Sequence, residues 1–158
     1  MPAMPPNRLD ATARRYAAVE RRLFEVVGAW VPDTPEPEVK LALRLASFRH
    51  AWHAELWEGL AGAAPLHPEE ADVGPLLAAV TTAERLTAFY GVVLPGLVGG
   101  YERLLGEAAD DVAAGGPLRR LLTLALADDR AELAEGRRLL AEHGHGEPPA
   151  PSEGHQSH

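Results

Sequence analysis

Four long segments of this chain carry apolar residues at helical spacing, and this periodicity restricts the fold to packed helices. Proline and glycine clusters separate the segments, because both residues interrupt helices and form turns. No strand pattern competes. We therefore expect an all-α four-helix bundle over residues 7–143, with helices at about Asn7 to Trp30, Glu38 to Ala61, Leu76 to Glu107 and Pro117 to His143.

The composition suits one domain with a continuous core: the chain has 158 residues, of which 46% are hydrophobic and 24% charged. A net charge of −8 and a pI near 5.3 give no electrostatic basis for binding nucleic acid or an anionic membrane. We expect neither partner, and a cytoplasmic protein. Because the chain has no cysteine, disulfides, thiolate ligands and cysteine nucleophiles are excluded.

The last fifteen residues, 144–158, differ in composition from the rest of the chain and are rich in glycine, proline, serine and histidine. Such a segment is too polar to join a core, so we expect a disordered tail. The histidines at this end could collect divalent metal without forming an organised site. They are His143, His145, His155 and His158.

Charged and imidazole side chains interrupt the apolar stripe of three predicted helices. Glu20 stands at the centre of the first stripe, and His50 and His53 occupy the second. Their i, i+3 spacing places both rings on one side of the helix. Ser47 falls on the opposite, polar side of that second helix. Asp129 and Glu132 interrupt the stripe of the last helix with the same spacing. Neighbouring acids such as Asp128 fall at the edge of that stripe, and we expect them in solvent.

All three groups lie near the middle of their helices, so they meet at one level whichever way the helices run. A carboxylate buried alone is costly and acquires a proton, a donor or a cation. Carboxylate and imidazole groups together suit iron, manganese or zinc. The pattern therefore predicts a site for iron or another divalent metal ion, with the ligands Glu20, His50, His53, Asp129 and Glu132.

Arg49 supports a different interpretation, because it falls within the apolar arc beside the histidines. Its fixed charge would neutralise a buried acid without a metal. The alternative function is then a metal-free structural or protein-interaction bundle whose Arg49, histidine and acid cluster is a buried ion-pair network. A metal-free small-molecule site with His53 as acid or base is a third alternative.

The third predicted helix carries no central acid, since Glu84 and Glu102 flank its stripe far from the middle. That apolar seam consists of Leu76, Val80, Ala83, Thr87, Tyr90, Leu94, Leu97, Tyr101 and Leu104. The glycines and Pro95 of this helix predict a kink or bulge, because proline removes a backbone hydrogen bond. The small residues either allow close helix packing or open a pocket beside Tyr90 for a small-molecule substrate. An exposed Trp or Leu on a helix edge would also support a homodimer.

An inward glutamate on the first helix, histidines on the second and an acid pair on the last resemble the ferritin-like superfamily over about residues 9–143. The stretch LFEVVGAWVPDTPEPEVKLALRLASFRHAWHAELW is also similar to actinobacterial ferritin-like proteins that have no assigned activity. This resemblance implies a metal site and oxidase or oxygenase chemistry. By position, Glu20 matches the first-helix ligand, and either His50 or His53 matches the second-helix histidine.

The resemblance departs from the family pattern at three places. Ser47 stands where a glutamate would precede His50, and Glu132 replaces the final histidine of the pair that begins at Asp129. The third helix lacks a central acid. A standard di-iron centre is therefore not expected, which leaves a single ion or a rearranged pair that recruits Glu84.

The connection between the second and third helices leaves two topologies open. About 14 residues can stretch to roughly 45 Å, against a helix length of about 36 Å. This just permits the long crossover of ferritin-like bundles. A plain up-down-up-down bundle fits the same connection with less strain.

Overall fold

The computed structural model describes residues 6–63, 65–108 and 115–145, and this part of the chain is helical without strands. The prediction of an all-α fold is confirmed. None of the helices in these ranges has the length and apolar character needed to cross a membrane. The elements are α1 (Pro6–Trp30), α2 (Pro37–Ala61), the 3₁₀ helix η1 (Pro68–Glu70), α3 (Gly74–Ala78), α4 (Thr82–Ala88), the π-helical segment η2 (Phe89–Val93), α5 (Leu94–Ala108) and α6 (Gly115–His143).

The helix bounds agree with the sequence pattern except in the third segment. The first, second and last helices begin one or two residues before the predicted positions. The predicted tail falls outside the described residues beyond residue 145. Within the third segment, α3 is separate, and the chain is non-helical at residues 79–81 before α4 begins. The predicted single helix from Leu76 to Glu107 is wrong at this break.

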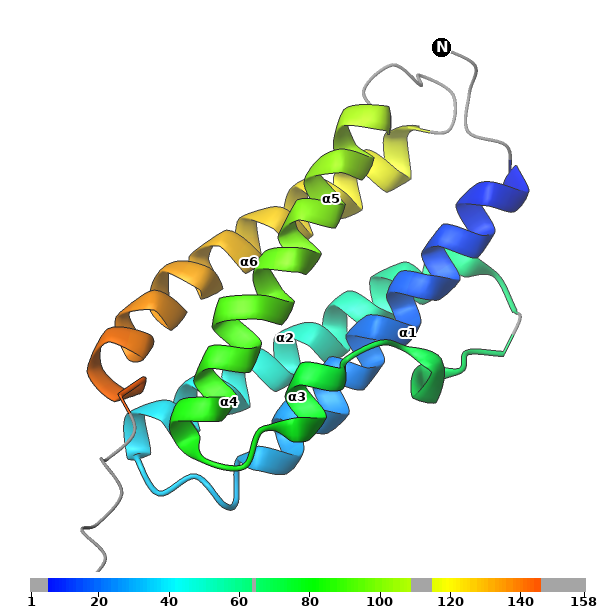
Figure 1. Ribbon diagram of the computed structural model, residues 1–158. Coiled ribbons are helices and arrows are strands. Elements are labelled where there is room, and N and C mark those ends of the chain that lie inside the picture. The colour runs from blue at the N-terminus through cyan, green and yellow to red at the C-terminus, as the bar shows by residue number, and fades with distance from the viewer. Residues whose placement is uncertain (1–5, 64, 109–114, 146–158) are drawn as a thin grey trace, which may run out of the picture.

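A long crossover joins the two helix pairs (Figure 1). α1 and α2 form an antiparallel pair, after which residues 65–81 run back along α1, with η1 packed against it. The hydroxyl of Thr82, at the start of α4, donates to Glu36, just before α2, at 2.9 Å. α4 and α5 therefore run parallel to α2, and α6 returns antiparallel beside them. Of the two topologies left open above, the structure has the crossover.

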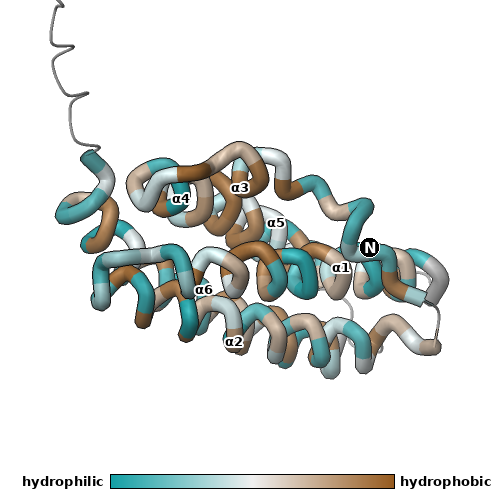
Figure 2. Tube along the Cα trace, turned by 90° about the horizontal axis from the view of Figure 1, so that it is seen from below, coloured by the Kyte–Doolittle hydropathy of each residue, from teal (hydrophilic) through white to brown (hydrophobic). Residues whose placement is uncertain are grey.

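The predicted apolar stripes of α1, α2 and α6 face the interior, and hydrophobic and hydrophilic residues alternate around each helix in Figure 2. The largest fully buried side chains come from all the long helices and form one core. They include Trp57, Tyr101, Phe89, Leu23, Leu43, Leu122, Leu126 and Leu139. Helical periodicity alone therefore identified the buried faces of three helices.

Close packing of α1 on α2 depends on two small residues. The hydroxyl of Ser47 donates to the Phe24 carbonyl at 3.1 Å, and a Cβ at Gly28 would lie 2.8 Å from that hydroxyl. Ser47 is buried, although its helical angle had placed it on the polar side of α2. The expectation was wrong because α1 packs over this flank of α2.

The N-terminus of α4 uses Glu84 as part of a capping box. The Glu84 carboxylate accepts hydrogen bonds from the backbone N–H groups of Val80 and Thr81, and the Thr81 hydroxyl accepts from the Glu84 N–H. This reciprocal arrangement satisfies the free donors at a helix start. Glu84 is exposed, so the expectation that it could join a metal pair is wrong. Val80, which we expected on the buried seam, is 72% exposed.

The bulge predicted ahead of Pro95 is present as the π-helical segment η2, in which the Leu94 N–H donates to the Phe89 carbonyl five residues earlier. A π-helical turn contains one more residue than an α-helical turn. The residues before it therefore face a different direction from the one that an unbroken α-helix would give them. Phe89 and Tyr90 are consequently both buried, whereas Thr87, expected on the seam, is exposed.

Tyr90 packs directly on Gly136 of α6. A Cβ built at Gly136 would lie 2.1 Å from Cδ1 and 2.4 Å from Cγ of the tyrosine ring. Gly100 likewise leaves room for the Tyr16 hydroxyl, which would be 2.8 Å from an added Cβ. At these positions the glycines serve close helix packing, and the Tyr90 ring fills the space beside α6.

We predict that Gly136→Ala destabilises the protein by about 1–3 kcal/mol, because the added methyl group would overlap the buried Tyr90 ring next to its Cβ attachment and force it to move. Gly59→Ala is the matched control, since nothing lies within 4 Å of a Cβ at that helical glycine. The control should gain up to about 1 kcal/mol from helix propensity. Urea unfolding followed by circular dichroism measures both, and a Gly136→Ala protein as stable as wild type would contradict the packing.

Candidate metal centre

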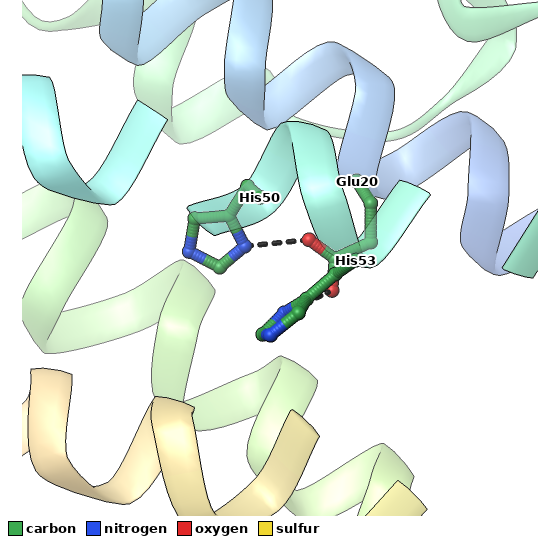
Figure 3. A group of neighbouring side chains, drawn as sticks. All are labelled: Glu20, His50 and His53. Carbon is green, nitrogen blue, oxygen red and sulfur yellow. Dashed lines mark hydrogen bonds and ion pairs between the residues drawn. The ribbon is translucent and has the colours of Figure 1, made fainter. Parts of the chain in front are cut away.

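The five residues expected to form a site converge from three helices. Glu20 comes from α1, His50 and His53 from α2, and Asp129 and Glu132 from α6. None of the five is more than 4% exposed. Figure 3 shows the Glu20 carboxylate turned toward the two imidazoles. The predicted convergence in the interior is therefore present in the structure.

The imidazole of His50 bridges two carboxylates from different helices. Its Nδ1 lies 2.5 Å from Glu20 Oε2, and its Nε2 lies 3.1 Å from Glu132 Oε2. An imidazole protonated on both nitrogens donates to both acids. His50 thereby links α1 to α6 through α2.

His53 has one nitrogen satisfied and one free. Its Nε2 lies 2.9 Å from Asp128 Oδ2, so an N–H at this position donates to that carboxylate. Its Nδ1 faces the cluster, 3.6 Å from Glu20 Oε1 and 3.7 Å from Asp129 Oδ1, and has no hydrogen-bond partner. In the neutral imidazole, Asp128 therefore selects the tautomer whose Nδ1 lone pair points at the acids. Burial opposes charging of His53, but Glu20, Asp129 and Asp128 outweigh it and raise the His53 pKa, so without a metal these acids favour a proton on Nδ1.

Asp128 was expected in solvent, and this is wrong, because its side chain is only 34% exposed and holds His53. A carboxylate that orients a ligating imidazole from outside is a recurrent feature of metal sites. No sequence signal beyond its position at the edge of the α6 stripe marks it. Whether such a residue reaches the imidazole depends on the rotation of α6 against α2.

Four buried acceptor atoms in the cluster have no hydrogen-bond partner. They are Nδ1 of His53, both carboxylate oxygens of Asp129 and Oε1 of Glu132. Buried polar atoms are nearly always paired, so a group of unpaired acceptors in one place requires an explanation. All four atoms can donate a lone pair to a cation. None of them can form a hydrogen bond with another of the four unless one of the two carries a proton.

The α5 helix contributes a hydroxyl where sequence analysis found no acid. The Tyr101 hydroxyl donates to Glu20 Oε1 at 2.6 Å and accepts from the indole N–H of Trp57 at 2.9 Å. Burial and the nearby Glu20 charge raise the pKa of Tyr101 well above its usual value, so it remains a donor. Tyr101 thus fixes the orientation of the Glu20 carboxylate.

Aromatic rings and one cation border the cluster. The Phe89 ring of η2 stands edge-on to His50 with the ring centroids 5.7 Å apart. Arg49 lies at the margin, 31% exposed, with Nη1 3.4 Å from Glu132 Oε2. The half-exposed guanidinium is close enough to offset part of the charge on Glu132, as the ion-pair interpretation expected.

The charges of the cluster are strongly coupled. Burial opposes ionisation of Glu20, but the charge and hydrogen bond of His50, with help from His53, outweigh it and lower the Glu20 pKa to about 2. Burial also opposes charging of His50, and the carboxylates of Glu132 and Glu20 overcome this and raise its pKa well above the usual value. Without a metal, His50 is therefore an imidazolium between two carboxylates.

Asp129 behaves differently from Glu20. Burial raises its pKa to about 7, with Glu20 and Glu132 adding to the rise against the opposing charge of His50. Its lack of any donor is the structural reason. Without a metal, Asp129 is therefore about half protonated at neutral pH.

Two groups within the cluster bring three ligand atoms within 4.8 Å of one another: Glu20 with His50 and His53, and His50 with Asp129 and Glu132. Both groups use His50, whose two nitrogens face Glu20 and Glu132. The described part of the chain has two further groups at the surface. They consist of Glu38, Glu142 and His143, and of His67, Glu69 and Glu70.

Two further acids form ion pairs outside the cluster. Glu102 is exposed and accepts a hydrogen bond from Arg130 at 3.2 Å, so it does not enter the cluster. Glu38, in the first turn of α2, pairs with Arg138 of α6. His155 and His158 lie outside the described residues.

Comparison of the chain with family models, with curated proteins and with solved structures yields no match.

We predict that Asp129→Asn removes part of the pH dependence of stability in the metal-free protein. In the unfolded chain Asp129 ionises near 3.8, and in the folded protein near 7. The folded state therefore binds more protons between these values, and the free energy of unfolding falls as pH rises through that window. Relative to the variant, the free energy of unfolding of wild type should fall by on the order of a few kcal/mol between about pH 4 and 8.

Urea unfolding in the presence of a chelator measures this difference, because the other titrating groups are common to both proteins. Parallel pH profiles for wild type and Asp129→Asn would contradict a buried, unpaired Asp129.

Proposed function

We propose that this protein is a metal-binding protein of the ferritin-like type, a four-helix bundle that holds one divalent iron, manganese or zinc ion between α1, α2 and α6. The observation that carries the proposal is the set of buried acceptors without partners, at His53, Asp129 and Glu132. Helix–helix carboxylate and histidine sites of this kind are built in the cores of such bundles. The crossover that makes α2 parallel to α4 and α5 also supports the ferritin-type arrangement.

The charge of the cluster is compatible with a divalent ion. Glu20, Asp129 and Glu132 are three buried carboxylates, and Arg49 supplies one positive charge at the margin. Asp128 adds a fourth, half-exposed carboxylate through its hydrogen bond to His53. With neutral imidazoles, one divalent cation therefore offsets most of the net negative charge of this set. Metal binding would displace the His50 proton, because a ligating imidazole must be neutral.

The ligand set favours metals that accept both oxygen and nitrogen donors. Three carboxylates and two imidazoles suit iron, manganese or zinc, and the absence of thiolates disfavours copper(I). Asp128 would hold the His53 tautomer that presents Nδ1 to the ion, and Tyr101 would hold Glu20 in orientation. Both residues therefore preorganise the proposed ligands.

The finer part of the proposal is an oxidase or oxygenase activity. Bound iron or manganese would supply one-electron and dioxygen chemistry. The chain itself would exclude bulk water from the site, where the five proposed ligands are buried and Phe89 covers His50. A small-molecule substrate beside Tyr90 would have to displace the ring from its contact with Gly136.

A second candidate function is a metal-free interaction bundle whose ion pairs fix the helix register. The position of His50 between Glu20 and Glu132, with Arg49 3.4 Å from Glu132, favours it. This function accounts for the paired atoms but leaves His53 Nδ1 and both Asp129 oxygens unsatisfied. We therefore rank metal binding first.

We predict that the protein purifies with, or takes up, one metal ion per chain, and that Glu20→Gln/Asp129→Asn abolishes this. The sample should carry alanine at His145, His155 and His158, so that the tail cannot bind metal. Elemental analysis after dialysis gives the stoichiometry. The matched control is Glu38→Gln/Glu142→Gln, which removes the carboxylates of a surface group and should leave the stoichiometry at one.

Asp128→Asn provides a graded test in the same assay. It keeps the ligands but weakens the orientation of His53, so the affinity should fall by about 10- to 100-fold without loss of stoichiometry. Absence of bound metal in wild type, after loading with iron, manganese and zinc in turn, would reject the proposal and favour the ion-pair bundle. Metal loss in the Glu38→Gln/Glu142→Gln control alone would locate binding at the surface.

A further inference from the structure

The outer face of α2 carries a continuous apolar stripe that no described element covers. It consists of Leu41, Leu45, Phe48 and Trp52, which are 58%, 53%, 57% and 44% exposed. These four residues define what we call the outer α2 stripe. Their spacing of four, three and four residues matches that of a helix that packs along a second helix. Isolated exposed hydrophobic residues are ordinary, but a row along one helix indicates an interface.

The apolar surface extends from the stripe onto α6. Leu124 of α6 is 36% exposed, and it borders a groove of about 400 Å³ with Leu56, Leu60 and Leu121. Large aromatic and aliphatic side chains at this exposure present on the order of 400 Å² of apolar surface in one molecule. Two such faces together with their margins would bury on the order of 1,000 Å², the lower limit for a specific interface.

Charges beside the stripe are arranged so that the face complements a reversed copy of itself. Lys40 lies near the start of the stripe and Glu55 just beyond its end, and both are exposed. Arg44 lies on the same flank, with its guanidinium over the Phe48 ring at 5.7 Å. An antiparallel copy would bring each basic end beside an acidic end. A parallel copy would place like charges together.

We propose that the outer α2 stripe is the interface of a homodimer in which α2 packs antiparallel against the same helix of a second copy. A two-fold axis at the centre of the stripe, between Leu45 and Phe48, places Leu45 opposite the partner's Phe48. It also places Leu41 opposite the partner's Trp52. Lys40 then lies within about one helical turn of the partner's Glu55. An isologous contact of this kind closes at two subunits.

The stripe comes close to the buried cluster at Trp52, whose ring centroid lies 5.8 Å from that of His53. A second copy packed on Trp52 would therefore lie next to a residue of the cluster.

Sedimentation velocity on the full chain, over about 5–200 µM, tests the dimer. Wild type should sediment as a species with twice the chain mass of 16.9 kDa. Phe48→Glu and, independently, Leu45→Glu should give monomers that retain wild-type helicity by circular dichroism. Val92→Glu is the matched control, because Val92 is 53% exposed on η2, and this variant should remain a dimer. A wild type that stays monomeric, or that forms an open series of larger species, would overturn the proposal.

Charge reversal tests the antiparallel arrangement. Lys40→Glu and Glu55→Lys should each weaken the dimer about two- to five-fold at low salt, as expected for an exposed ion pair. The double reversal should restore wild-type affinity. Restoration supports the antiparallel pairing, and a double variant weaker than both single variants overturns it.

Fluorescence gives a second measurement that does not depend on a folded variant. Trp30 and Trp57 are buried within the chain, so a blue shift of emission with rising concentration reports burial of Trp52. Emission that does not change with concentration while the mass doubles would place the interface elsewhere.

Discussion

The packing of α1, α2 and α6 depends on how three buried carboxylates are compensated. Glu20 is fully satisfied by His50 and Tyr101, and Glu132 in part by His50 and Arg49. Asp129 has no partner on either oxygen. Burial of an unpaired carboxylate costs several kcal/mol, so it binds a proton or a cation. This asymmetry separates a purely structural ion-pair network from a ligand-binding site.

The same residues can serve two states of the cluster. Without metal, His50 carries a charge between Glu20 and Glu132, and Asp129, with a pKa of about 7, is about half protonated at neutral pH. With a divalent ion, both protons would leave and the cation would replace their charge, so metal affinity should rise with pH. Asp128 and Tyr101 bond to His53 and Glu20 in the metal-free structure. The proposed ligands are therefore oriented before a metal binds.

Helical periodicity predicted the residues of the buried cluster because burial on α1, α2 and α6 follows the 3.6-residue repeat closely. Glu20, His50 and Asp129 could be located by helical angle and height alone. Tyr101 and Asp128 could not, because their contacts depend on how α5 and α6 are rotated, which a single helix does not determine. The π-helical turn at Phe89 also changed the register of the third segment, so its seam was wrong at Thr87.

Anomalous diffraction from crystals of the metal-loaded protein, recorded on both sides of the absorption edge of the metal, tests the central claim most directly. The account predicts one peak in the interior, in contact with Nδ1 of His53 and with the Asp129 carboxylate. A peak confined to the surface at Glu38, Glu142 and His143, or no peak in a fully loaded sample, would contradict it.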